Sequence, residues 1–223
     1  MKSKHSYAQN DIDTVYRVIA ERRDMRHFVN EPLEAGVLAR LLNVANQAPS
    51  VGLMQPWRFI RITDTSLKMS LKGLVEAERN TTAALLDERK NSFLKLKVEG
   101  ILECAELIVV ALPDGREKHV FGRRTMPDMD LASVACAIQN MWLTARAEGI
   151  GLGWVSLFDP AQLATLLNMP EDSRPVAILC IGHVEKFYEK PMLVEQNWIQ
   201  PINIEAFLFE NSWPTNETNT TNK

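Results

Sequence analysis

The chain has 223 residues, 46% of them hydrophobic, and its 25 basic and 28 acidic side chains give a formal net charge of −3. These values are typical of one globular domain and exclude a largely disordered chain. The acidic balance argues against a general nucleic-acid binder, and none of the 10 glycines falls in a nucleotide-binding glycine pattern. We therefore expect a globular protein that binds no nucleic acid and has no glycine-rich phosphate loop.

Cysteine and histidine are sparse and scattered. The three cysteines (Cys104, Cys136 and Cys180) lie far apart in apolar runs, which indicates buried, reduced thiols. No cysteine and histidine cluster has metal-ligand spacing, so we expect no metal. The first residues lack the apolar core of a signal peptide, and no apolar stretch is long enough to span a bilayer. The sequence thus predicts a cytoplasmic protein with no membrane partner.

The N-terminal part of the chain predicts an arm followed by two helices. Residues 1–10 are expected to be a flexible N-terminal arm, and residues 11–213 a single domain. The spacing of apolar residues predicts a first helix capped by Asp13. Pro32 is suited to the first turn of a second helix, which Pro49 would end.

The rest of the chain alternates helices with short buried strands. Four apolar, β-branched runs predict strands, at 57–62, 108–112, 150–158 and 175–182. An apolar stripe predicts a long helix over 128–148. The polar helical run at about 76–97 is typical of a lid. The apolar, irregular segment at about 192–213 predicts a C-terminal arm that packs on a partner subunit, and composition predicts a disordered tail over 214–223.

One local feature does not fit the acidic average: Arg22, Arg23 and Arg26 crowd around Asp24. The ordinary interpretation is a helix end, where cations are stabilised by the helix dipole and solvated. The alternative is an anion site, because arginine forks bind phosphate in a bidentate manner. An acid among them opposes a site for phosphate alone. Asp24 is explained if it contacts another part of the same ligand, or if it holds one guanidinium in place.

Two further segments carry alternatives. The loop at 48–57 contains Pro49, Ser50 and Gln55, and it is either a turn built from turn-forming residues or a rim that offers hydrogen bonds to a planar polar ligand. Ser156 is the lone polar side chain of a predicted buried strand. Its hydroxyl is either satisfied by a backbone carbonyl or functional. No G-x-S-x-G motif is present, so a serine hydrolase is not expected.

In their order and joint presence, these segments resemble the nitroreductase-type flavoprotein family. The resemblance covers most of residues 13–200 and rests on the stretches 22–28, 48–57, 129–140, 151–156 and 187–193. It implies an α+β fold, a nitroreductase-like mixed β-sheet surrounded by helices, with a helical lid. It also implies a homodimer with FMN at the subunit interface and a C-terminal arm that crosses to the partner.

Within that family, two positions resemble the flavin destructases: Asp24 follows the arginine pair where nitroreductases commonly have Ser, and Ser156 follows Gly-Trp-Val. The implied reaction is the oxygen-dependent fragmentation of reduced FMN to 5,6-dimethylbenzimidazole, the lower ligand of cobalamin, plus a four-carbon sugar phosphate. A separate NAD(P)H-dependent flavin reductase would supply reduced FMN. The resemblance implies that Asp24 and Ser156 are catalytic. It implies flavin contacts for Arg22, Arg23, Asp24, Met25, Arg26, Pro49, Ser50, Gln55, Ser156 and Leu157.

Two other functions stay open at this point. One is an ordinary NAD(P)H-dependent FMN nitroreductase, which returns its flavin intact; Asp24 and the predicted lid count against it. The other is a non-catalytic flavin-binding protein, in which bound flavin stays intact after reduction and aeration. Asp24 itself has two candidate roles, as a base near the ribityl chain or as a group that only orients that chain. The basic loop at 116–124 has no assigned role.

Overall fold

The structure is a computed structural model that describes residues 4–214. The chain divides into two units at the Glu189–Lys190 bond, and each is described by itself. The predicted single domain over 11–213 is therefore divided near its C-terminal end. Nearly all of the predicted tail, residues 215–223, lies outside the described residues.

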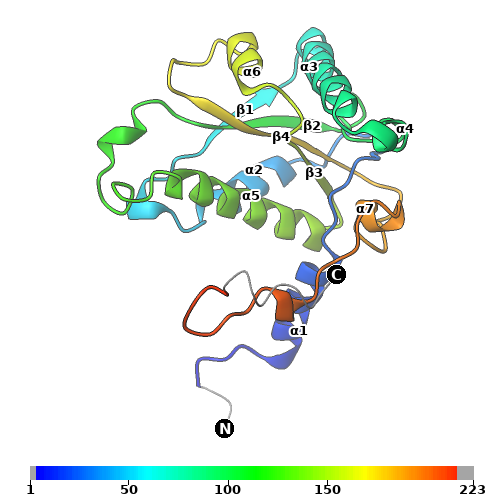
Figure 1. Cartoon of the computed structure of the whole chain (residues 1–223). Coiled ribbons are helices and arrows are strands. Elements are labelled where there is room, and N and C mark those ends of the chain that lie inside the picture. The colour runs from blue at the N-terminus through cyan, green and yellow to red at the C-terminus, as the bar shows by residue number, and fades with distance from the viewer. Residues whose placement is uncertain (1–3, 215–223) are drawn as a thin grey trace. The chain divides into compact units, whose positions relative to one another are not determined.

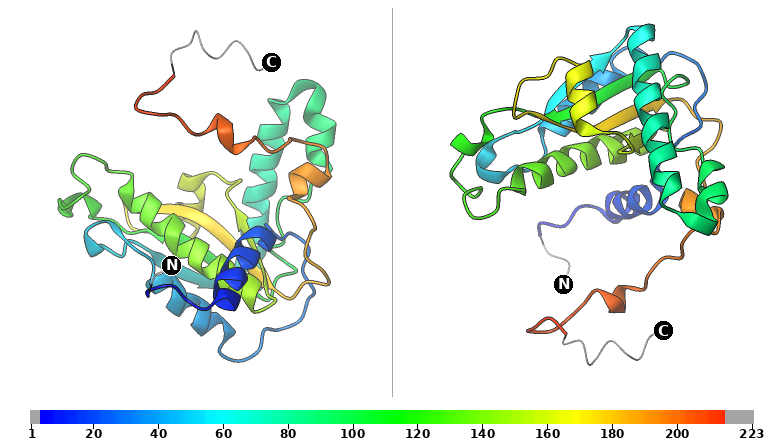
Figure 2. Two further views of the ribbon diagram at one scale, coloured as in Figure 1. Left: turned by 90° about the horizontal axis from the view of Figure 1, so that it is seen from below. Right: turned by 45° about the horizontal axis from the view of Figure 1, so that its top comes forward.

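The first unit is built on one four-stranded sheet (Figure 1). Its strands are β1 (Arg58–Ile62), β2 (Glu106–Leu112), β3 (Gly151–Val155) and β4 (Arg174–Gly182), in the order β1-β2-β4-β3. All neighbouring strands are antiparallel, with Ile108 of β2 opposite Arg61 of β1 and Leu179 of β4. A parallel bridge between Asp24 and Leu152 makes the sheet mixed at its β3 edge. Strands form at all four predicted places, although β3 ends at Val155 rather than at 158, and the α+β fold is confirmed. Figure 2 shows the same sheet and helices from two further sides.

Helices cover both faces of this sheet, which explains why its central strands are apolar throughout. In Figure 1, α2 and α5 lie on one face, while α3 and α6 lie on the other. The helices are α1 (Gln9–Glu21), α2 (Val37–Asn46), α3 (Thr65–Ala84), α4 (Lys90–Leu94), α5 (Met129–Ala147), α6 (Pro160–Leu166) and α7 (Met192–Glu195). Leu41, Ile138 and Leu179 belong to the core beneath α2 and α5. Leu71 and Leu163 belong to the core beneath α3 and α6.

The structure corrects two predicted helix starts. The first helix begins at Gln9, within the predicted N-terminal arm. Asp13 lies inside this helix and does not cap it; its Oδ1 accepts a hydrogen bond from the side-chain amide of Gln9 (2.8 Å). The second helix begins at Val37, not at Pro32, because Gly36 directly before it has a left-handed backbone conformation (φ 86°) that cannot be part of an α-helix. Asp13 and Pro32 are residue types that favour a helix start, but the two helices start after Ala8 and Gly36 instead.

The thiols also differ in part from the prediction. Cys104 and Cys180 are buried and free, as predicted, but Cys136 is free and exposed on α5. It lies on the side of the helix away from the sheet, because its neighbours Val134 and Ile138 face the core.

The region predicted as a lid consists of the second half of α3 followed by α4. Arg79 of α3 joins the two: its guanidinium donates to the carbonyl oxygens of Leu94 and Leu96, the latter at 3.0 Å, and pairs with Glu76. Ala83 is buried at the end of α3. The helical character of this region is confirmed, whereas its role as a lid stays a prediction.

The second unit contains α7 and a short 3-10 turn (Ile204–Ala206). Several of its apolar side chains are exposed, among them Ile199, Phe207, Leu208 and Trp213. The rings of Phe209 and Trp213 lie 5.3 Å apart. Its apolar surface is thus covered only in part by its own residues.

Candidate active site

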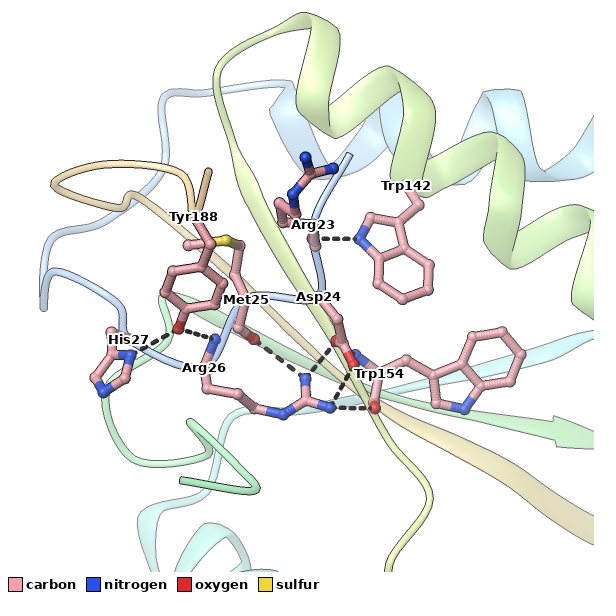
Figure 3. A network of polar contacts seen from close by, with 8 residues as sticks. All are labelled: Arg23, Asp24, Met25, Arg26, His27, Trp142, Trp154 and Tyr188. Atoms are coloured by element: carbon pink, nitrogen blue, oxygen red, sulfur yellow. Dashed lines mark hydrogen bonds and ion pairs between the residues drawn. The ribbon is translucent and has the colours of Figure 1, made fainter. Parts of the chain in front are cut away.

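The arginine-rich segment follows the end of α1 and runs along the free edge of β3. Figure 3 shows Asp24 and Arg26 of this segment beside Trp154 of β3. The Met25 amide donates to the Leu152 carbonyl (3.1 Å), as a strand residue would. Beyond that bond, side chains replace backbone: the Trp154 amide donates to Asp24 Oδ1 (2.9 Å), and Arg26 Nη2 donates to the Trp154 carbonyl (2.8 Å). Two oppositely charged side chains therefore complete the edge of β3.

Asp24 and Arg26 form a two-pronged ion pair, with Nη1–Oδ1 at 2.5 Å and Nη2–Oδ2 at 2.6 Å. The guanidinium lies beneath the carboxylate, since the Arg26 side chain is 10% exposed and that of Asp24 is 42% exposed. Asp24 is thus held from inside while one side of its carboxylate remains open to a ligand. This arrangement matches the alternative in which the acid holds a guanidinium in place.

Opposing influences act on the pKa of Asp24. Burial raises this pKa, whereas the positive charge of Arg26, the Trp154 amide and the charge of Arg22 lower it. The balance lies above the ordinary value, so the site holds the carboxyl closer to its protonated form than water would. A carboxyl of this kind is suited to exchange a proton with a ligand.

Arg22 differs from the other two arginines. Its guanidinium lies over the Trp142 ring, 4.5 Å from the centroid, and burial lowers its pKa. Trp142 in turn lies 6.2 Å from the Trp154 ring. Within residues 4–214 the Arg22 guanidinium makes no hydrogen bond, so its donors remain available to a ligand.

Arg23 serves the fold. Its Nη1 donates to the carbonyls of Ala20 and Arg22 (2.7 and 2.8 Å), and its Nη2 donates to the Glu189 carbonyl (2.7 Å). It therefore satisfies free carbonyls where α1 ends, which is the ordinary interpretation of the cluster. Met25 is likewise internal, since it is 1% exposed.

Ser156 and Leu157 lie just beyond β3, which ends at Val155 and is shorter than predicted. Ser156 is therefore exposed and not part of a buried strand, whereas Leu157 is half-buried. Within the described part of the chain the Ser156 hydroxyl has no hydrogen-bond partner, so it is not explained as a satisfied core hydroxyl. It follows Trp154, the contact of Asp24, by two residues.

The loop with Pro49, Ser50 and Gln55 is locally constrained. The Gln55 amide donates to Ser50 Oγ (3.1 Å), and the Gln55 side chain donates to Asn46 Oδ1 (3.3 Å). Leu53 and Gln55 have positive φ angles of 53° and 48°, which non-glycine residues adopt only when their surroundings impose them. Pro49 and Gln55 are exposed.

One chain does not bring all the predicted site residues together. The loop meets the first half of α5, where the Val51 amide donates to Ser133 Oγ (3.0 Å). The Asp24 segment meets the second half, where Trp142 Nε1 donates to the Arg23 carbonyl (3.1 Å). At 1.5 Å per residue, these contacts lie about 14 Å apart along α5. The loop and the β3 edge are therefore two separate parts of a candidate site.

The basic loop at 116–124 binds a buried acid. Arg116 Nε and Arg123 Nε each lie 2.9 Å from Asp130 Oδ2, and Asp130 is 4% exposed. These two arginines therefore neutralise a buried carboxylate at the start of α5.

Sequence reasoning missed several residues of the β3 edge. Trp142 reads as part of the α5 core stripe, and Trp154 reads as an ordinary strand residue. Tyr188 was noticed only through the resemblance; its hydroxyl accepts from the Arg26 amide (3.2 Å) and lies 2.6 Å from His27 Nδ1. The available signal was the Gly-Leu-Gly-Trp sequence of β3, because a glycine inside a strand often marks the close approach of another backbone segment.

The described residues include no group of three or more His, Cys, Asp and Glu side chains that could hold a metal. The helices of residues 4–214 are all too short or too polar to cross a membrane. The side chains at the β3 edge suit FMN. Arg22 has free donors for a phosphate, and Asp24 and Ser156 offer a carboxyl and a hydroxyl to polar groups. Trp142 and Trp154 add two indole rings.

The family model for the nitroreductase family matches residues 19–183, and the chain belongs to that family. The 5,6-dimethylbenzimidazole synthase of Rhodospirillum rubrum is 37% identical over 179 residues, which are 79% of this chain and 85% of the relative. That of Rhodobacter capsulatus is 37% identical over 195 residues, 86% and 94%. A structure of iodotyrosine deiodinase bound to FMN and 3-iodo-L-tyrosine shares the fold, with a TM-score of 0.67 and 23% identity over 89% of this chain and 100% of that one.

Proposed function

We propose that this protein fragments reduced FMN with molecular oxygen into 5,6-dimethylbenzimidazole, a four-carbon sugar phosphate and the remaining pyrimidine part of the ring system. The names of two relatives that are each 37% identical over most of their length support this reaction. The observation that carries the proposal is the partly exposed Asp24 carboxylate, which accepts from the Trp154 amide at the β3 edge, two residues before Ser156.

Each residue of the β3 edge has a proposed part. Arg22, which keeps its donors, binds the phosphate of FMN. Asp24, whose pKa is raised by burial, holds or accepts a proton at the ribityl chain. Ser156 donates a hydrogen bond to the polar part of the ring system. When bound, reduced FMN supplies the electrons that react with oxygen, and the helices at 76–97 exclude water as a lid.

The two parts of the site also support a homodimer. The Ser50–Gln55 loop and the Asp24 segment contact opposite halves of α5, and in a homodimer a second copy would bring the loop of one subunit to the β3 edge of the other. The apolar segment at 192–213 would then cross to the partner, which suits the exposed side chains of Phe207, Leu208 and Trp213. Size-exclusion chromatography with light scattering tests this, and an active monomer at high dilution would contradict it.

The reaction is tested by incubating the protein with FMN, NADH, a flavin reductase and air, followed by mass spectrometry. We expect 5,6-dimethylbenzimidazole to accumulate as FMN disappears, with no product under argon. Steady NAD(P)H-dependent reduction of a nitroaromatic with full recovery of FMN would instead establish a nitroreductase. Intact FMN with no turnover of either kind would identify a flavin-binding protein.

A further inference from the structure

We propose that Arg26 is a positioning residue, whose guanidinium holds the Asp24 carboxylate at the β3 edge, and that it does not bind the phosphate of FMN. This inference rests on the proposed function where it concerns the reaction. It also makes a claim about Asp24 alone, which the protein without flavin can test. Two arginines of the same sequence cluster are thereby assigned different roles. Arg22 binds the phosphate, and Arg26 holds the Asp24 carboxylate.

The hydrogen bonds of Arg26 carry the first step. An arginine side chain has five N–H donors in a planar fork. Nη1 donates to Asp24 Oδ1 (2.5 Å) and to the Met25 carbonyl (3.2 Å), and Nη2 donates to Asp24 Oδ2 (2.6 Å) and to the Trp154 carbonyl (2.8 Å). The fifth donor, on Nε, is buried without a partner among the described residues. No outward-facing donor is left for a phosphate.

The space for this guanidinium depends on Gly153. A Cβ at that position would lie 2.6 Å from Arg26 Nη1 and 2.1 Å from the Met25 carbonyl oxygen. Both distances are too short for any side chain, so the guanidinium can lie flat against β3 only beside a glycine. Gly153 is therefore required inside β3 because the Met25 backbone and the Arg26 guanidinium occupy the space of a side chain.

The backbone of Arg26 is fixed from its other side. Its amide donates to the Tyr188 hydroxyl (3.2 Å), which also contacts His27 Nδ1 (2.6 Å), as Figure 3 shows. The start of the Arg26 side chain and its fork are therefore both held, and the direction in which the fork meets Asp24 is set. Arg22 has no comparable restraint on its guanidinium, which lies over the ring of Trp142.

A consequence for Asp24 separates a positioning role from a merely structural one. The charged groups that face this carboxyl are Arg26 and Arg22, and both lower its pKa against the effect of burial. Removal of the Arg26 charge leaves burial opposed by Arg22 and by the Trp154 amide. The pKa of Asp24 then rises further. Where Asp24 acts by accepting a proton, it must be ionised first, so the acid limb of product formation moves to higher pH.

The first experiment compares Arg26→Met and Arg26→Lys with the matched variant Arg22→Met. The affinities for FMN and for riboflavin, which lacks the phosphate, are measured under argon. We expect Arg22→Met to lower the ratio of FMN to riboflavin affinity about tenfold or more, as befits a lost charge-assisted contact. Both Arg26 variants should keep the wild-type ratio. A ratio that falls in Arg26→Met as it does in Arg22→Met would overturn the proposal.

The second experiment needs no turnover. The Asp24 carboxyl is titrated by carbon NMR in the flavin-free protein, with Asp24→Asn to assign its signal. We expect a higher pKa in Arg26→Met and an intermediate value in Arg26→Lys, which keeps the charge but loses the fork. An unchanged pKa in Arg26→Met would overturn the proposal. If the wild-type protein makes no 5,6-dimethylbenzimidazole, the proposed function fails while this titration still decides the role of Arg26.

Where product is made, the two roles also divide kinetically. The Arg26 variants should lose kcat at an unchanged KM for reduced FMN, and their acid limb should lie at higher pH. Arg26→Lys should recover part of both, because a lysine still presents a positive charge to Asp24. A raised KM with unchanged kcat and pH profile would identify Arg26 as a flavin ligand and refute a positioning role.

Discussion

Replacement of Gly153 by alanine tests how closely the Asp24 segment approaches β3. The added Cβ would lie 2.1 Å from the Met25 carbonyl oxygen, and contacts of Cβ atoms below 3.0 Å essentially never occur. The segment must therefore retreat by roughly an ångström. Three hydrogen bonds along the edge would then be stretched or broken: Met25 to Leu152, Trp154 to Asp24, and Arg26 to Trp154.

The magnitude follows from the kind of bonds at risk. One is a neutral backbone bond, worth about 0.5–1.5 kcal/mol, and two involve charged side chains, worth about 1.5–3 kcal/mol each. Asp24 is partly exposed, so water replaces some of what is lost. We therefore expect Gly153→Ala to lower the free energy of unfolding by about 3.5 kcal/mol, the lower end of the sum.

The chain contains a matched control for the same chemical change. Gly73 lies inside α3, and a Cβ there would meet nothing within 4 Å. Gly73→Ala should raise the free energy of unfolding by up to about 1 kcal/mol, because alanine favours the helix. Urea unfolding of both variants, followed by far-ultraviolet circular dichroism, measures the two effects. A Gly153→Ala protein within about 0.5 kcal/mol of wild type would refute the close approach of the segment to β3.

Three further predictions concern the same edge. Asp24→Asn and Ser156→Ala should abolish 5,6-dimethylbenzimidazole formation while FMN binding, followed by flavin fluorescence, is largely kept; product at the wild-type rate in either variant contradicts the assigned roles. Tyr188→Phe leaves the Arg26 amide without its acceptor and should destabilise the protein by about 1 kcal/mol in urea; no change in midpoint argues against that contact. Because the pKa of Asp24 is raised on folding, its contribution to stability is fully present below its ordinary value of 3.8 and is lost as pH rises through the raised pKa. The fall of unfolding free energy over that interval should be smaller in Asp24→Asn, and equal slopes would contradict the raised pKa.

The sequence predicted the fold better than the details of the site, for a physical reason. Strands such as β2 and β4 are buried on both faces, so their apolar runs were visible in the sequence alone. The partners of the arginines were not visible, because Arg23 reaches Glu189 and Arg26 reaches Trp154 across 166 and 128 positions of sequence. Three arginines that look equivalent in sequence thus have three different environments.

The same limit applies to the polar residues that the sequence singled out. Ser156 was placed in a buried strand because its neighbours are apolar, but β3 ends one residue earlier and leaves its hydroxyl exposed. The Ser50–Gln55 loop was grouped with Asp24 as one site, although the two segments contact opposite halves of α5, about 14 Å apart. Local composition indicates what a residue can do, and only the folded chain decides which residues it can act with.

The way β3 is closed also bears on aggregation. An edge strand with free amides and carbonyls is a template on which another chain can add a strand. Here the Trp154 amide and carbonyl are both taken by the side chains of Asp24 and Arg26, so an ion pair takes the place of a neighbouring strand. Loss of either side chain exposes a backbone group of Trp154, so a substitution that changes the chemistry of this pair also weakens the protection of the sheet edge against an added strand.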